Sequence, residues 1–138
     1  MAGPAVIDHT RPARRIPEFG TASQADVPAF IGVMGILHRE PTSSAFARLL
    51  IGSPREEDAV SLAHVFEEIS TMALHGLIAE DLLFDAFAFD SYWEQLKGSV
   101  EKARASGGNP KFCENFEIAA GLAEAYRESR PPKPRVHN

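Results

Sequence analysis

The residues best suited to chemistry in this sequence lie between positions 57 and 75, where polar side chains recur at intervals of three and four. On a helix this spacing puts His64 and Glu68 one turn apart on a single face, where both can bind one metal ion. His75 continues the same face. Di-metal helical bundles use Glu-x-x-His pairs on two helices, whereas this chain has one pair in reverse order, His64-x-x-Glu67. We therefore favour a solvated helix face and keep His64, Glu68 and His75 as an alternative metal-binding or small-molecule-binding face.

Cys113 is the single cysteine of the chain, which excludes an internal disulfide and a multi-cysteine zinc site and is typical of a reducing cytoplasm. A thiol at the start of a helix can act as a nucleophile, with His64 or His75 as its base. Phe112 and Phe116 flank this thiol, however, and a cysteine among aromatic residues is usually a small buried hydrophobe. We expect a buried thiol, we lean against enzymatic activity, and we assign no catalytic residue and no cofactor.

Three acidic residues, Glu80, Asp81 and Asp85, accompany the most apolar segment of the chain. Acids so close together can serve as paired carboxylates, but Glu80 and Asp81 are better explained by the positive end of a helix dipole. Asp85 needs a partner in such apolar surroundings. Arg104 or Lys97 is the partner that we expect, which gives Asp85 a structural role.

Hydrophobic periodicity predicts six helices. The clearest covers residues 54–75, with Ser53 as N-cap, Pro54 in the first turn and Gly76 as the signal that ends it. A buried strand over 29–37 is the competing interpretation of the first helix. The other expected helices cover 24–39, 43–51, 79–88, a segment from Asp90 to Gly107, and a segment that starts at Asn109-Pro110.

These elements predict an all-α fold, a compact bundle of five to six helices with extended or disordered tails. The helix over 54–75 and the last two helices are its long members, and the apolar segment 79–88 packs between them. Trp93 should anchor its own helix against that segment. Prolines predict an arm over 1–20 and a basic proline-rich tail over 129–138, on either side of a helical domain over 21–128.

Charge is unevenly distributed along the chain. The net charge is −5; residues 1–20 carry +1 and residues 127–138 carry +3, so the body carries −9. Because affinity for nucleic acid depends on Lys and Arg that neutralise phosphates, we expect no nucleic-acid partner. The basic tails can reach an acidic surface or fold back on the body. No apolar run approaches the roughly 20 residues of a bilayer span, so we expect a cytoplasmic protein without membrane insertion.

Three segments carry a family resemblance: HGLIAEDLLFDAF, then YWEQL with Arg104 at the end of its helix, then ENFEIAAGLAE. Over about 55–125 the chain resembles the bacterial helical family known as domain of unknown function 4760. The resemblance implies an uncharacterised helical domain. Members of that family often carry a transmembrane helix ahead of this domain, and the family has no established activity. The resemblance therefore assigns no catalytic residue.

Abundant packing signals without an assembled catalytic set favour a soluble helical domain that acts by protein–protein interaction or self-association. The expected contact is on the first helix, where Gly32 and Gly35 leave a flat strip that another helix can approach closely. An apolar helix that the later helices do not need is a natural place for a partner or for a second copy. The expected interface residues are Phe30, Ile31, Met34 and Leu37.

Overall fold

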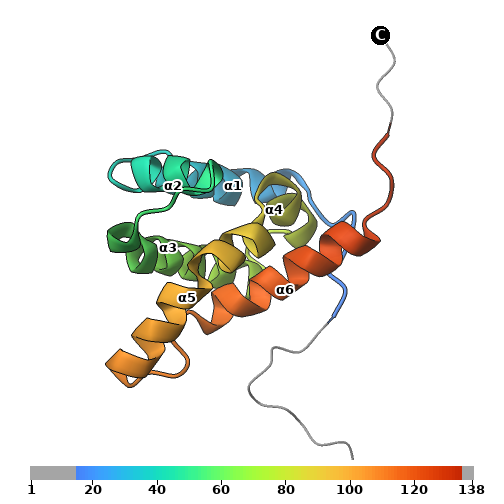
Figure 1. Ribbon diagram of the computed structural model, residues 1–138. Helices are drawn as coiled ribbons and strands as arrows, with labels where there is room; N and C mark the ends of the chain where they lie inside the picture. Colours follow the sequence, from blue (N-terminus) through green and yellow to red (C-terminus); the bar gives the residue numbers. More distant parts are fainter. Residues whose placement is uncertain (1–14, 135–138) are drawn as a thin grey trace, which may run out of the picture.

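The computed structural model describes residues 15–134, and all regular structure in that range is helical. The elements are a 3-10 turn η1 (Gln24–Asp26) and the helices α1 (Val27–Leu37), α2 (Thr42–Leu50), α3 (Glu56–Leu74), α4 (Glu80–Ala86), α5 (Phe89–Gly107) and α6 (Glu114–Ser129). This confirms the all-α fold with six helices, of which α3, α5 and α6 are the longest (Figure 1). The competing strand over 29–37 is wrong, because that segment lies within α1.

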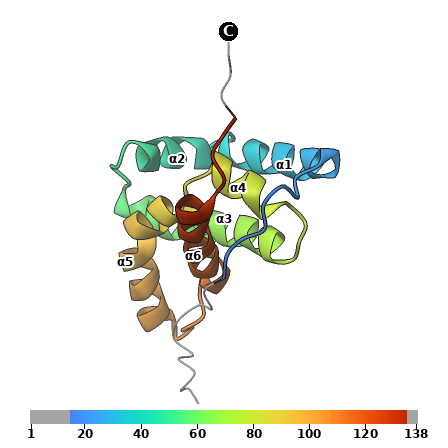
Figure 2. The same ribbon diagram turned by 90° about the vertical axis from the view of Figure 1, so that its right-hand side faces the viewer.

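The core lies where α3, α5 and α6 pack against one another. Phe66 of α3 stands at its centre, with ring centroids 4.9 Å from Tyr92, 5.3 Å from Phe89 and 5.2 Å from Phe116. Such aromatic pairs stabilise a core beyond the area that they bury. Figures 1 and 2 both show α1 and α2 together along one side of the molecule, so these two helices form an outer layer.

Trp93 contacts a different helix from the one expected. Its ring meets Phe116 of α6 edge-on at 5.2 Å, and it is only partly buried. The aromatic contact between α4 and the start of α5 is made instead by Phe84 and Phe89, at 6.0 Å. The packing of Trp93 against the segment 79–88 is therefore a wrong prediction; Trp93 anchors α5 to α6.

The start of α3 differs from the capping prediction. The helix begins at Glu56 after Arg55, which makes no side-chain cap. Ser53 is not its N-cap, because that position is Arg55, two residues later. The Ser53 N–H instead donates to the Arg48 carbonyl at 2.9 Å and closes the end of α2. Gly52, at φ +77°, allows this Schellman closure. The same motif ends α3 at Gly76, at φ +73°, as the sequence predicts.

Two further helix starts are shifted. Asn109 and Pro110 form a turn rather than the first residues of α6, because the Asn109 side chain accepts the Lys111 N–H at 3.1 Å. The helix starts at Glu114, after Cys113 in a left-handed conformation at φ 59°. Similarly, α5 begins at Phe89, and Asp90 does not cap it.

The described parts of the two tails, residues 15–23 and 130–134, form neither helix nor strand. The rest of the expected arm and tail, residues 1–14 and 135–138, lies outside the described residues. Within 15–134, none of the helices combines the length and the apolar character needed to cross a bilayer. Both tails make ion pairs with α4.

Candidate functional site

The predicted metal-binding face lies on the solvent side of α3. His64 Nδ1 is 3.1 Å from Glu68 Oε1, and the two side chains are 57% and 62% exposed. His75 follows as the exposed residue that ends the helix. Across residues 15–134, no three His, Cys, Asp or Glu side chains are grouped so that they could hold a metal ion. The structure therefore pairs two of the three candidate residues and does not add His75 to them.

The inner edge of the same polar stripe joins α3 to the start of α6. The Phe116 N–H donates to Glu67 Oε1 at 2.8 Å, and Asn115 Nδ2 donates to Thr71 Oγ1 at 2.9 Å. The Thr71 hydroxyl in turn donates to the Glu67 carbonyl at 2.8 Å. The first four N–H groups of a helix have no partner within it, so Glu67 acts as an N-cap supplied by another helix. Neither Glu67 nor Thr71 was predicted to have this role.

Arg104 completes this junction from α5. Its Nε donates to the Phe112 carbonyl at 2.8 Å, its Nη2 is 2.9 Å from Glu117 Oε1, and its guanidinium lies 5.7 Å from the centre of the Trp93 ring. A guanidinium with a carboxylate, a carbonyl and an aromatic face has its charge compensated. These partners make Arg104 a structural residue.

Cys113 is buried at the same junction, with 2% of its surface exposed. Burial, with a smaller contribution from Glu67, raises the pKa of the Cys113 thiol to about 12, although Arg104 opposes the shift. At neutral pH the group is a neutral thiol, which is a poor nucleophile. Of its two candidate bases, His64 stacks on the Phe112 ring with centroids 6.5 Å apart. The junction thus holds α6 in place and leaves Cys113 unactivated.

The acids of α4 are paired with the tails of the chain. Glu80 accepts two hydrogen bonds from Arg15, one of them 2.9 Å long. Asp81 accepts the Gly20 N–H at 2.6 Å. Both contacts come from the segment before η1, so the arm is attached to the start of α4.

Asp85 has partners other than those expected. Its Oδ1 accepts from the Tyr126 hydroxyl at 3.0 Å and lies 2.7 Å from Lys133 Nζ. The hydrogen bond from Lys133, supported by the one from Tyr126, lowers the pKa of Asp85. The expected partners Arg104 and Lys97 pair instead with Glu117 and Glu94. That prediction is wrong because the tail folds back onto α4.

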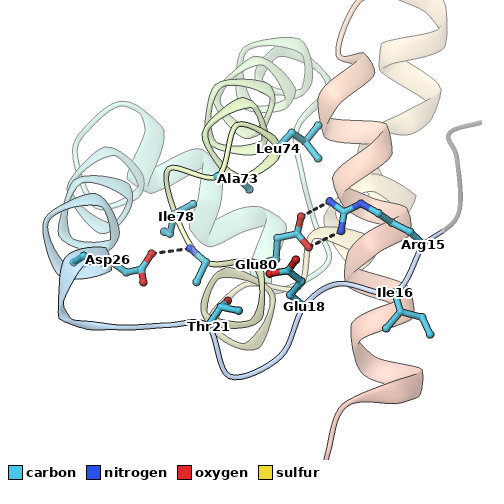
Figure 3. A pocket seen from close by; sticks show the side chains of 12 residues that line it. Arg15, Ile16, Glu18, Thr21, Asp26, Ala73, Leu74, Ile78 and Glu80 are labelled. Atoms are coloured by element: carbon cyan, nitrogen blue, oxygen red, sulfur yellow. Dashed lines mark hydrogen bonds and ion pairs between the residues drawn. The ribbon is translucent and has the colours of Figure 1, made fainter.

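A surface pocket of about 640 Å³ lies between the arm and the loop that joins α3 to α4 (Figure 3). Arg15 and Glu80 pair at one side of it, and the Ala79 N–H donates to Asp26 Oδ1 at 2.8 Å at the other. Leu74 and Ile78 supply apolar lining. Because Glu80 and Asp26 both have partners within the chain, these polar groups fasten the arm rather than form an open charged site.

The predicted interface on α1 divides between core and solvent. Leu37 is fully buried, and Phe30 and Met34 pack partly against the core. Ile31 is exposed over 57% of its surface, Val27 over 49% and Ile36 over 37%. Of the four predicted interface residues, Ile31 is thus the most exposed. The other exposed apolar residues on this side of α1, Val27 and Ile36, are not among the predicted interface residues.

Residues 15–134 thus form a helical domain with a hydrogen-bonded junction between α3, α5 and α6, tail segments that pair with α4, and an exposed apolar side of α1. The family described as Domain of unknown function (DUF4760) matches residues 23–121, and the chain belongs to this family. No curated protein and no solved structure matches it. The match begins at Ser23, which caps η1, so it extends further towards the N-terminus than the expected 55–125. It includes α1 and α2 and leaves out residues 15–22 and 122–134 of the described part of the chain.

Proposed function

We propose that this domain acts through self-association, in which the exposed side of α1 contacts a second copy of the chain. We name this surface the α1 face. Its members are apolar or lack a side chain altogether, and they alternate along the helix with the residues that face the core. The α1 face consists of Val27, Pro28, Ile31, Gly32, Gly35 and Ile36.

The observation that carries the proposal is the complete absence of polar side chains from α1, whose sequence is VPAFIGVMGIL. A helix at a protein surface normally has a polar side. Here Val33 and Leu37 fill the core from one side, while Ile31 and Val27 are about half exposed on the other. Burial of apolar surface is favourable by about 25 cal/mol per Å². Covering this face with a partner therefore stabilises the complex.

Helix dipoles and shape favour a second copy as the partner. In a two-fold, antiparallel pair of α1 helices, the dipoles of the two helices oppose favourably. At Gly32 and Gly35 an added Cβ would have no neighbour within 4 Å, so nothing in the same chain prevents close approach of another helix.

The size of the contact sets the expected affinity. One helix of 11 residues covers less than the ~800 Å² per partner of a standard interface. We therefore expect a dimer that forms at micromolar concentrations.

Light scattering on the intact chain and on Ile31→Asp tests the proposal. The intact chain should be dimeric at high micromolar concentration, and Ile31→Asp should be a folded monomer, because it places a charge on an apolar contact without touching the core. Val60→Asp is the matched control: Val60 is an exposed apolar residue, at 41%, on α3, and its variant should remain dimeric. A monomeric intact chain, or equal masses for the two variants, would contradict the proposal. Circular dichroism confirms that each variant is folded.

A further inference from the structure

Three consecutive residues at the start of α4 each bind a different residue of the segment 15–26. We call these residues, 79–81, the clasp. The three pairs are Asp26 with Ala79, Arg15 with Glu80, and Gly20 with Asp81. Figure 3 shows the first two of them on opposite sides of the pocket. The clasp therefore holds the segment near its beginning, its middle and its end.

Apolar contacts also seat this segment on the body. Pro17 is buried and Phe19 is partly buried. The Phe19 ring lies 5.8 Å from the ring of Tyr126 on α6. Because buried side chains accompany the hydrogen bonds, residues 15–22 are docked as part of the domain, although they precede the family match.

Asp26 connects the clasp to the start of α1. Its Oδ1 accepts the Ala79 N–H at 2.8 Å, and its Oδ2 accepts the Ser23 N–H at 2.8 Å and completes the capping box of η1. Hydrogen bonds from backbone N–H groups to a carboxylate are stronger than those between neutral groups. Since α1 begins at the next residue, Val27, this carboxylate fixes where the helix starts relative to α4.

The first half of α1 has few other attachments to the core. The two fully buried residues of the helix, Val33 and Leu37, lie in its second half. In the first half, Phe30 is partly buried and its ring lies 6.0 Å from that of Phe87. Segments with little buried apolar surface open locally at low cost. The position of this half therefore depends on the hold that Asp26 provides.

We propose that the clasp couples the docking of residues 15–22 to the position of the α1 face. While these residues are docked, Asp26 holds the first turns of α1 in place, and their release frees those turns. The consequence for dimerisation rests on the self-association proposed above, because Val27, Pro28 and Ile31 lie on the turns that the clasp holds. An event that takes the segment away from α4 thus weakens the dimer.

Hydrogen exchange with mass spectrometry on the full-length chain tests the coupling, at a concentration low enough that the chain is monomeric. Asp81→Ala removes the acceptor of the Gly20 N–H without changing α1. Amides of residues 27–37 should then exchange about threefold or more faster, since exchange reports local opening. Arg15→Ala leaves α4 itself unchanged and should act in the same direction.

Asp90→Ala is the matched control for Asp81→Ala. Asp90 is also an acid in the first turn of a helix, but it belongs to α5 and pairs with Arg127. Its loss should leave exchange in residues 27–37 unchanged.

Coupling between two sites is reciprocal, so Asp26→Ala should speed exchange in residues 15–22 as well as in α1. Ser23→Ala is its matched control. It removes only the local cap, in which the Ser23 hydroxyl accepts the Ala25 N–H at 3.2 Å, and it leaves the bond to Ala79 in place. Exchange in residues 15–22 should therefore stay unchanged in Ser23→Ala.

Three results would overturn the coupling. The first is unchanged exchange in residues 27–37 after both Asp81→Ala and Arg15→Ala. The second is an increase that is equally large in α6, which would show a loss of overall stability. The third is an equal effect of Asp81→Ala and Asp90→Ala.

Light scattering at high micromolar concentration separates this proposal from self-association itself. A dimer whose affinity falls about threefold or more in Asp81→Ala supports both, because the fraction of chains competent to bind is reduced. Coupled exchange in a chain that does not dimerise supports the clasp and contradicts self-association. A dimer without coupled exchange supports self-association and overturns the clasp.

Discussion

Glu67 supports the start of α6 from another helix. Its carboxylate accepts the Phe116 N–H at 2.8 Å, and Cys113, the local N-cap residue, makes no side-chain cap. A carboxylate at this end of a helix also interacts favourably with the helix dipole. Glu67 thus replaces a local cap with a tertiary one and fixes the position of α6 against α3.

We expect Glu67→Ala to lower the free energy of unfolding by about 1–2 kcal/mol, the usual cost of losing a helix cap. Glu67→Gln keeps an acceptor and should lose less. Glu68→Ala is the matched control, since the contact of Glu68 with His64 is exposed and its loss should change stability by less than about 0.5 kcal/mol. Urea unfolding measures all three. Equal losses for the two alanine variants would contradict the capping role.

Cys113 should resist thiol reagents in the folded protein. Because burial raises the pKa of this thiol to about 12, almost no thiolate is present at about pH 8. We expect slow labelling by a disulfide reagent under native conditions and fast labelling in concentrated guanidinium. Rapid labelling of the native chain would show that the thiol is accessible and ionised.

The same pKa shift predicts a loss of stability at alkaline pH. Below the unfolded-state pKa, near 9.0, the thiol is neutral in both states and its contribution is fully present. As pH rises towards 12, the unfolded chain loses this proton first, so the free energy of unfolding falls. Cys113→Ala should have a weaker alkaline dependence in thermal melts. Identical pH profiles for the two chains would exclude Cys113 as the cause.

At the scale of elements, signals that are local in sequence predicted more than signals that depend on tertiary contacts. Gly76 ends α3 as expected because its positive φ is a local requirement. The start of α3 was missed because the Ser53 N–H belongs to the end of α2. The start of α6 was missed because its cap, Glu67, is 49 residues away from Phe116.

For the candidate sites too, local sequence signals predicted more than signals that depend on tertiary contacts. Helical spacing correctly placed His64 and Glu68 together, at 3.1 Å. Helical spacing could not show which side of α1 faces the core. All sides of that helix carry apolar residues, so the sequence pattern does not distinguish a buried side from an exposed one. For this reason Leu37 was assigned to an interface although it is buried. The partner of Asp85 was missed because no sequence pattern shows where a proline-rich tail folds back.

The glycines of α1 lead to a prediction with two opposite effects. Gly32→Ala should stabilise the folded monomer by up to about 1 kcal/mol, because alanine favours the helix and the added Cβ meets nothing within 4 Å. The same methyl group should weaken dimerisation by separating the two helices. Gly98→Ala on α5 is the matched control, with equally open surroundings. It should stabilise the chain without changing the dimer, as thermal melts and light scattering can show. Stronger association of Gly32→Ala would contradict close helix approach.

At the scale of the whole molecule, both ends of the chain attach to α4. Arg15 pairs with Glu80, and Lys133 pairs with Asp85. The basic tails thereby neutralise two acids of the acidic body. Within residues 15–134 no tail segment pairs with the α1 face, which agrees with a surface that a second copy completes.

Disulfide trapping at Gly32 is the most direct test of that pairing. Gly32→Cys puts a thiol in the middle of the α1 face, whereas Gly98→Cys puts one on α5, and both positions have open surroundings. The native Cys113 is buried and should not interfere. Under mild oxidation at micromolar concentration, Gly32→Cys should form a covalent dimer of twice 15.0 kDa, and Gly98→Cys should remain a monomer on a non-reducing gel. If Gly32→Cys stays monomeric, or if both variants cross-link at the same rate, α1 is not where two copies meet.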